Sequence, residues 1–302
     1  MLDIITRAGS FVAIIILGFV LRKIGFFREE DFGTLSKIAI RITLPAAIVS
    51  NMAGREIDLS MLSLTALGLL GGVLYMAAAY LVTLKRSKET RAFAVLNLPG
   101  YNIGNFALPF VQSFLGASGV VVTSLFDVGN SFVCLGGAFG IASMIQAGKG
   151  FSPKRLGKAL LTSVPFLTYI VMTALCLLRL SLPGPVISFA GIISNATAFV
   201  AMLMIGVGFR LSIDRAKIGS MVTILGLRYG IAAVLAAVIY FLLPFAPEIR
   251  QTLVILVFSP IGSAVPPFTR ELGGDTGLSC ALNSISIVIS IVCIVTLLTV
   301  ML

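Results

Sequence analysis

Two ionisable side chains stand deep inside apolar stretches of the sequence. Asp127 comes about nine residues into one stretch and Arg228 about ten into another, so in helices each would lie roughly 14–15 Å from the nearer end. If those helices cross a membrane, such a charge costs several kcal/mol unless it is paired or hydrated. In one interpretation Asp127 carries protons, while Arg228 is a counter-charge for an anionic substrate or holds Asp127 ionised. In the other, the two residues form a structural ion pair.

Two segments combine prolines, glycines and small polar residues in the middle of apolar runs. They are Leu98–Pro109, which reads LPGYNIGNFALP, and Phe258–Pro267, which reads FSPIGSAVPP. Proline lacks the N–H and clashes with the preceding turn, so each segment should unwind. Unwound backbone at membrane depth is tolerated only where it lines a cavity or is buried in protein. Both breaks therefore indicate a binding site; the alternative is two ordinary proline kinks.

The groups at the two breaks suit an anion. The half-helices that resume after each break direct partial positive charge and free N–H groups inward, which favours a carboxylate. Asn102, Asn105 and Ser263 supply further hydrogen bonds. The candidate site also takes in the neighbouring residues Gly104, Gly262, Pro109 and Pro266.

The composition places the chain in a membrane. Of 302 residues, 58% are hydrophobic and 11% are charged, whereas a soluble domain has about 25% charged residues. A water-soluble enzyme is therefore excluded. The chain has no His, and its four cysteines stand singly, so no metal site, disulfide framework or cofactor is predicted. An intramembrane aspartyl protease needs two acids, and only Asp127 is available.

Apolar runs predict an all-α polytopic fold with ten transmembrane helices. Charges separate most of the runs, whereas the fourth and fifth are divided only by Gly116-Ala117-Ser118-Gly119. The first run has no cleavage site of the signal-peptide kind, so it is read as a span. The predicted spans are Ile4–Ile24, Phe32–Ala53, Leu59–Leu84, Ala92–Leu115, Ala117–Ala147, Ala159–Leu178, Pro185–Phe209, Ile218–Leu243, Gln251–Thr269 and Gly277–Met301.

The distribution of basic residues predicts the orientation. Alternate connections hold 17 of the 22 Lys and Arg residues, and the opposite side, with both chain ends, holds only Arg7, Arg55, Arg179 and Arg250. The positive-inside rule assigns the basic side to the cytoplasm, so both termini should face outward, in a bacterial inner membrane. The net charge of +10 is then explained by topology and does not indicate nucleic-acid binding.

The span order predicts two inverted five-helix repeats. Residues 1–147 and 159–302 would form the repeats, joined by a basic cytoplasmic linker at residues 148–158. An odd number of spans per repeat gives the two copies opposite orientations, as in many secondary transporters.

A constant offset of about 157 residues supports the duplication. It brings Gly68-x-x-x-Gly72 onto Gly226-x-x-x-Gly230, and Pro109 onto Pro266 and Pro267. Each G-x-x-x-G motif would also fit a close contact between two helices. The glycines of Gly136-Gly137-x-x-Gly140 likewise suit either a homodimer contact or internal packing.

The coupling ion is less constrained by the sequence. Unwound carbonyls together with Asn105, Asn130, Ser259 and Asn283 would supply oxygens for a sodium ion, but neither break contains an acid. Protons or the membrane potential are therefore favoured over sodium. A channel or a non-transporting sensor on the same fold is a further alternative.

Several short motifs resemble the auxin efflux carrier family. They are Leu44-Pro45-Ala46 with Asn51, the stretch from Asn102 to Pro109, Asn195-Ala-Thr-Ala with Gly206-x-Gly208-Phe209, and Ser263-Ala-Val-Pro-Pro267. The family includes plant auxin exporters and bacterial permeases for malate, malonate and similar acids. The resemblance covers the whole chain in span order, but the long central cytoplasmic loop of many plant members is missing.

The resemblance implies a fold like that of sodium/proton antiporters and bile acid transporters. Spans 1, 2, 6 and 7 would form a scaffold, and spans 3 to 5 and 8 to 10 a moving core with helices 4 and 9 broken and crossed. The substrate anion would lie beside the crossed breaks, at Asn102, Asn105, Ser263 and the flanking prolines, and the motif residues Asn51 and Asn195 are added to the candidate site. The expected function is secondary transport of a small organic anion by alternating access.

Overall fold

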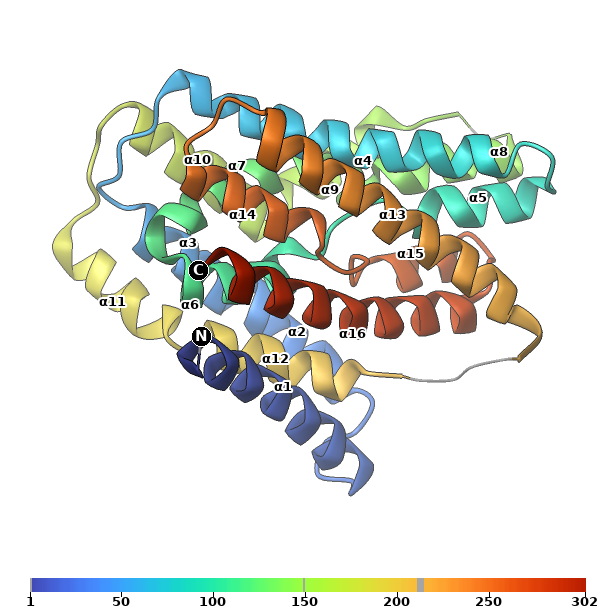
Figure 1. Ribbon diagram of the computed structural model, residues 1–302, viewed down its shortest axis with the longest axis horizontal. Coiled ribbons are helices and arrows are strands. Elements are labelled where there is room, and N and C mark those ends of the chain that lie inside the picture. The colour runs from blue at the N-terminus through green and yellow to red at the C-terminus, as the bar shows by residue number, and fades with distance from the viewer. Residues whose placement is uncertain (1, 149, 211–214) are drawn as a thin grey trace.

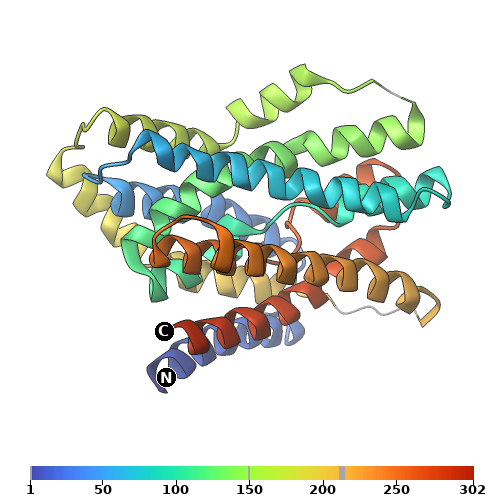
Figure 2. The same ribbon diagram turned by 45° about the horizontal axis from the view of Figure 1, so that its top comes forward.

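The chain folds into a bundle of helices, and the part that the structure describes contains no strand. This computed structural model describes residues 2–148, 150–210 and 215–302; Lys149, part of the predicted basic linker, lies outside the described residues. The beginning of α1 and the end of α16 lie side by side toward one end of the bundle (Figures 1 and 2). The α4–α5 connection and the beginning of α13 lie toward the other end.

Most predicted spans correspond to one long helix or to consecutive shorter ones. The helices are α1 (Leu2–Lys23), α2 (Asp31–Ile38), η1 (Ala39–Thr43), α3 (Leu44–Met52), η2 (Leu59–Leu62), α4 (Ser63–Val82), α5 (Lys88–Asn97), η3 (Ile103–Ala107), α6 (Leu108–Phe114), α7 (Gly116–Phe132), η4 (Val133–Gly137), α8 (Ala138–Ala147), α9 (Pro153–Leu161), α10 (Val164–Leu177), α11 (Gly184–Ser194), α12 (Thr197–Gly208), η5 (Arg215–Lys217), α13 (Ile218–Leu242), α14 (Pro247–Val257), α15 (Val265–Glu271) and α16 (Thr276–Met301).

Within the described residues, seven helical segments are long and apolar enough to cross a membrane, or eight if the bent pair α9–α10 counts as one span. The seven are Ile5–Lys23, Asp31–Met52, Leu59–Val82, Gly116–Gln146, Gly184–Gly208, Arg215–Leu242 and Thr276–Met301. The remaining apolar helices are two pairs, α5 with α6 and α14 with α15, in which a non-helical segment separates two short halves.

Two Leu-Pro pairs follow widened helical turns. The π turn η1 precedes Leu44-Pro45, and the π turn η3 precedes Leu108-Pro109, with each proline in the first turn of the following helix. Because proline cannot donate to the carbonyl four residues earlier, the turn before it opens. The Thr43 carbonyl is bonded by the Thr197 hydroxyl at 3.1 Å, which joins two motifs that carried the family resemblance.

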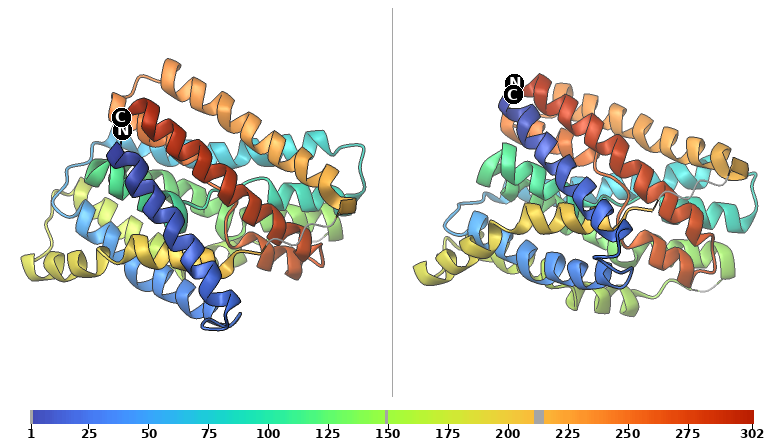
Figure 3. Two further views of the ribbon diagram at one scale, coloured as in Figure 1. Left: turned by 60° about the horizontal axis from the view of Figure 1, so that its bottom comes forward. Right: turned by 90° about the horizontal axis from the view of Figure 1, so that it is seen from below.

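One group of helices is α1 with α12, and α3 with α10 and α11. Gly18 of α1 and Gly206 of α12 let these two backbones approach so closely that a β-carbon on Gly206 would strike the Ile15 carbonyl. At the end of α12 the Arg22 guanidinium donates to the carbonyls of Val207 (2.8 Å) and Phe209 (2.7 Å). Figure 3 shows α1 running beside α16, at the edge of this group.

The second group contains the remaining long helices. α4 packs on α7, α5 on α8, α13 on α14 and α16, and α15 on α5 and α16. Gly68 and Gly129 permit the α4–α7 contact, because a β-carbon on Gly68 would collide with the Phe126 carbonyl and one on Gly129 with the Thr65 carbonyl. A β-carbon added to Gly226 or Gly230 of α13 would meet no atom within 4 Å, so the second G-x-x-x-G motif makes no such contact.

One local expectation needs correction. The predicted sixth span, Ala159–Leu178, is not one straight helix: α9 and α10 meet at an angle of 73° around Thr162–Ser163. The second half of the predicted linker is helical, because Ser152 caps α9 by accepting from the Arg155 N–H and Pro153 starts the helix. The turn between the fourth and fifth runs falls at Leu115, one residue before the predicted position, since α6 ends at Phe114 and α7 begins at Gly116.

Helix α9 is fastened to neighbours in the second group. The Arg155 guanidinium lies 4.2 Å from the centre of the Phe139 ring of α8 and pairs with Glu271, at the end of α15, at 2.8 Å. Gly140 of α8 faces the Phe151 ring, so this glycine-rich surface packs inside the molecule.

The connections at this end of the bundle surround a cavity of about 730 Å³. Its wall includes Arg86 and Glu89 from the α4–α5 region, Gln146 from α8 and Asp275 before α16. Asp275 pairs with Lys217 at 2.5 Å. Most of the basic connections identified in the sequence therefore meet at one end of the molecule.

Candidate functional site

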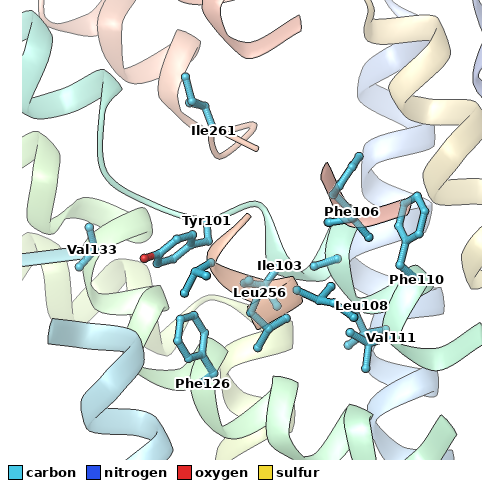
Figure 4. Packing of buried hydrophobic residues seen from close by; sticks show 14 of the residues in the cluster. Tyr101, Ile103, Phe106, Leu108, Phe110, Val111, Phe126, Val133, Leu256 and Ile261 are labelled. Carbon is cyan, nitrogen blue, oxygen red and sulfur yellow. The ribbon is translucent and has the colours of Figure 1, made fainter. Parts of the chain in front are cut away.

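The two predicted breaks are present, and they touch each other. α5 ends at Asn97 and helical structure resumes at Ile103, while α14 ends at Val257 and α15 begins at Val265. The Asn102 N–H donates to the Pro260 carbonyl at 3.0 Å, which joins one unwound segment to the other. Figure 4 shows part of the apolar packing around them, with Tyr101 and Ile103 on the first break and Ile261 on the second.

An amide side chain holds the first break in place. Asn130 of α7 accepts from the Tyr101 N–H at 3.0 Å and donates to the Tyr101 carbonyl at 2.9 Å. These bonds replace those that a continuous helix would supply, so the unwound backbone is satisfied at depth.

Helix α16 does the same for the second break. Asn283 donates to the Ile261 carbonyl at 2.8 Å, and the Ser286 hydroxyl accepts from the Ile261 N–H at 3.1 Å. The sequence assigned Asn130 and Asn283 to ion coupling. In the structure the Asn283 amide donates to a backbone carbonyl, and the Asn130 amide donates to the Tyr101 carbonyl and to the Asp127 carboxylate.

Arg228 contacts both breaks at once. Its side chain is 1% exposed, and its guanidinium donates to the carbonyls of Leu98, Gly100 (3.0 Å), Ser259 (2.8 Å) and Pro260 (3.1 Å). Carbonyls at the C-terminal end of a helix carry partial negative charge, so they are natural partners for a cation.

Asp127 and Arg228 do not form the structural ion pair that the sequence allowed. The Asp127 carboxylate accepts from Asn130 at 2.7 Å and from the Tyr169 hydroxyl of α10 at 3.0 Å, and no Lys or Arg among the described residues pairs with it. The reason is that backbone carbonyls already take the hydrogen bonds of Arg228. Asp127 instead links α7 to a helix of the first group.

A cavity of about 180 Å³ opens beside the two breaks. Asn102, Ser263 and Pro266 line it, together with α12 residues such as Met204. The cavity therefore lies between the two groups of helices, with break residues on one side.

Exposed charged residues also line this cavity and define its mouth. In the sequence, the two arginines among them served only to predict the topology. Arg210, Arg270 and Glu29 line the mouth, together with Phe32. Glu29 pairs with Arg210, whereas nothing in the described part of the chain bonds to the Arg270 side chain. The sequence did contain a signal that Arg270 lies near the second break: it follows Pro266 by four residues, so the two share one face of the same helix.

The other break residues lie close to the cavity or behind it. Asn105 is buried, its amide makes one long contact of 3.5 Å to the Ser263 hydroxyl, and its side-chain oxygen has no partner. Gly104 lies against the Leu44 side chain of the first group, where a β-carbon would come within 2.5 Å of it. Pro109 is buried at the start of α6, and Gly262 has open space beside it, with nothing closer than 3.7 Å to an added β-carbon.

Asn51 and Asn195 do not join these residues around the cavity. The Asn51 amide donates to the Ala47 carbonyl of its own helix at 2.8 Å, and Asn195 is exposed at the junction of α11 and α12. Neither lines the cavity beside the breaks. Their motifs serve helix packing, since Thr197 of the second motif bonds the Thr43 carbonyl.

Comparison with known proteins identifies the kind of protein. Residues 5–149 match the family model described as membrane transport protein. The chain is also 24% identical over 287 residues to an uncharacterized transporter of Methanothermobacter thermautotrophicus, an alignment that covers 91% of each chain.

The chain is a membrane transporter whose first half resembles this family. The predicted resemblance to auxin efflux carriers is confirmed, and the transporter is a multi-pass membrane protein rather than an enzyme.

Proposed function

We propose that the transporter moves a small organic anion, such as a dicarboxylate or an auxin-like acid, by secondary active transport. The observation that carries this proposal is the cavity beside the contacting breaks, which Asn102 and Ser263 line together with α12 residues, with Arg270 at the mouth. An amide, a hydroxyl and a guanidinium are the donors that a carboxylate needs. Asn105 adds an amide whose oxygen has no partner.

The two groups of helices suit an alternating-access mechanism. The scaffold comprises α1, α2–α3, α9–α10 and α11–α12, and the core comprises α4 to α8 and α13 to α16. With each broken pair counted as one crossing, the chain has ten spans in two inverted repeats, residues 1–147 and 159–302. The support is that both breaks are held from behind by an asparagine of the next long helix, Asn130 and Asn283. Rocking of the core would expose the cavity to either side.

In this proposal the cavity mouth faces the cytoplasm and both termini lie outside, with the transporter in the cell's plasma membrane; the basic connections support this orientation. Arg86, Gln146, Asp275 and the pair Arg155–Glu271 lie at the end where basic residues gather. The positive-inside rule assigns such an end to the cytoplasm.

Protons or the membrane potential drive transport in this proposal. Asp127 is a buried acid without a cationic partner among the described residues, and it bonds a scaffold tyrosine, so its protonation would alter a core–scaffold contact. Sodium is less favoured, because Asn130 and Asn283 use their amides to hold backbone.

Counterflow in proteoliposomes tests the proposal. Vesicles loaded with one unlabelled carboxylate at a time are assayed for uptake of the labelled acid, with wild type, Asn105→Ala and Gln251→Ala compared. Gln251 is the matched amide control, because it lies outside the cavity and donates to the Met301 carbonyl at 3.2 Å. We expect counterflow with at least one acid in the wild type and in Gln251→Ala, and its loss in Asn105→Ala.

Two results would contradict this. Absence of counterflow with every acid, from protein shown to be folded, would remove the organic-anion assignment. Flux without counterflow would indicate a channel, since a pore does not couple the movement of two substrate molecules.

A further inference from the structure

Four backbone carbonyls from two distant segments converge on one side chain. Leu98 and Gly100 belong to the first break, Ser259 and Pro260 to the second, and all four accept from the Arg228 guanidinium. The guanidinium also faces two aromatic rings, at 5.4 Å from the centre of Tyr75 and 5.6 Å from that of Tyr101. Carbonyl oxygens and π faces are ligands for a cation, and no carboxylate of the described residues takes part.

This donor set is the chemistry of a site for a monovalent cation. In transporters with broken helices, unwound carbonyls and the C-terminal ends of half-helices coordinate the coupling cation. α5 and α14 end beside these carbonyls, so their negative dipole ends point toward Arg228. The side chain is almost fully buried, and a charge at that depth is tolerated because every carbonyl around it contributes.

We propose that Arg228 is a built-in cation: its guanidinium occupies a cation site between the two breaks and fixes them to each other. The fixed charge takes the place of a bound sodium or potassium ion at this position. It follows that the contact between the breaks needs no added salt. The positive charge behind Asn102 and Ser263 also raises the potential in the cavity where the proposed anion binds, and in this respect alone the inference rests on the proposed function.

The Tyr75 hydroxyl gives this arrangement a second anchor. It donates to the Arg228 carbonyl at 3.1 Å, so α4 holds the backbone of α13 at the level of the guanidinium. The Nε–H of Arg228 has no partner, which leaves the terminal nitrogens to make all the carbonyl contacts. A free guanidinium ion carries the same terminal nitrogens, so it can reproduce those contacts when the side chain is removed.

Chemical rescue tests the inference. Arg228→Ala is purified and its melting temperature is measured with a thiol-reactive dye, with and without millimolar guanidinium, sodium or potassium. We expect Arg228→Ala to melt below the wild type, and guanidinium to raise its melting temperature by binding the folded state only. The wild type should not respond. Arg250→Ala is the matched control, since Arg250 also donates to a carbonyl, that of Tyr240 at 2.8 Å, and lies over the Tyr240 ring, at the surface.

A second pair of variants covers the case in which Arg228→Ala does not fold. Arg228→Lys keeps a positive charge with three donors, whereas Arg228→Gln keeps length and polarity without charge. We expect the Lys variant to melt above the Gln variant and to retain part of the counterflow.

The melting temperatures test the inference without any substrate. A failure of this inference can therefore be distinguished from a failure of the anion assignment. An Arg228→Ala protein that melts like the wild type, or that responds to none of the three cations, overturns the proposal. So do equal melting temperatures for the Lys and Gln variants.

Discussion

Tyr169 of α10 donates its hydroxyl hydrogen to the Asp127 carboxylate of α7 at 3.0 Å, and both side chains are buried. Asn130 donates to the other carboxylate oxygen at 2.7 Å. Asp127 therefore connects the segment that holds the first break to a helix of the first group. A change in its protonation would alter a bond between the two helix groups, which is what the proposed proton coupling requires.

The first prediction concerns Asp127→Asn. The amide keeps the size and can still accept from Tyr169, but it cannot take up or release a proton. We expect counterflow to survive and accumulation driven by an imposed pH gradient to be lost. The two assays are run on the same vesicles, and Tyr169→Phe serves as a companion that removes the bond but leaves the acid. Undiminished pH-driven accumulation in Asp127→Asn would exclude the proton-carrier role.

The second prediction concerns Arg270 at the mouth of the cavity. Because nothing in the described part of the chain bonds its guanidinium, Arg270→Gln removes a positive charge without leaving a buried partner. We expect the apparent KM for the anion to rise about tenfold or less, with little change in maximal rate, because a rim charge acts mainly on association. Raising the salt concentration should shrink the difference between the two proteins.

The matched control for this prediction is Arg250→Gln, which removes an equal charge from a residue that does not line the cavity. An identical KM in Arg270→Gln and the wild type at low salt would argue against a role in anion recruitment.

The third prediction compares two G-x-x-x-G glycines. Gly68→Ala places a β-carbon against the Phe126 carbonyl, where backbone must shift, so we expect destabilisation of about 1–3 kcal/mol. Gly226→Ala has open space, and an alanine suits a helix better by up to about 1 kcal/mol, so stability should be unchanged or slightly higher. Melting of the two purified variants checks this. Equal losses in both would mean that α13 packs as closely as α4 does.

The fourth prediction concerns pH and the pair Lys217–Asp275. The Lys217 ammonium at 2.5 Å, and next the Leu278 N–H, hold the pKa of Asp275 below its ordinary value. A lowered folded-state pKa means that the pair stabilises the protein above the unfolded pKa of about 3.9 and that this is lost as pH falls through the lowered value. The side chains are 40% and 36% exposed, so the effect is at most about 1 kcal/mol.

Melting of wild type and Asp275→Asn at neutral pH and near pH 3 measures that contribution. Asparagine still caps α16, so only the charge is removed. The variant should melt lower than the wild type at neutral pH, and the difference should be smaller in acid. A difference of unchanged size in acid would mean that the loss comes from the cap and not from the ion pair.

Local chemistry explains what could be predicted from the sequence. Pro109 and Pro266 lack an N–H wherever they stand, so the helix starts after both breaks were foreseeable. The positions of the long helices were also foreseeable, because long apolar runs are typical of membrane-spanning helices.

Partners that depend on distant backbone could not be predicted. The bonds of Arg228 go to carbonyls 31 to 130 residues away, and a carbonyl leaves no trace in residue type. Reasoning from opposite charges therefore offered a pair between Arg228 and Asp127 as one interpretation, whereas the actual partners of Asp127 are a neutral amide and a phenol. Asn51 and Asn195 were assigned to the site through family motifs, although the structure gives their motifs a packing role.

The 73° bend between α9 and α10 lies where the first half of the chain passes into the second. Arg155 holds α9 to Phe139 and Glu271, while α10 beyond the bend bonds Asp127 and packs on α3. If the two helix groups move as proposed, a change of this one angle near Thr162–Ser163 would leave both sets of contacts intact. We therefore expect a cross-link that locks the angle to arrest transport from a place outside the binding cavity.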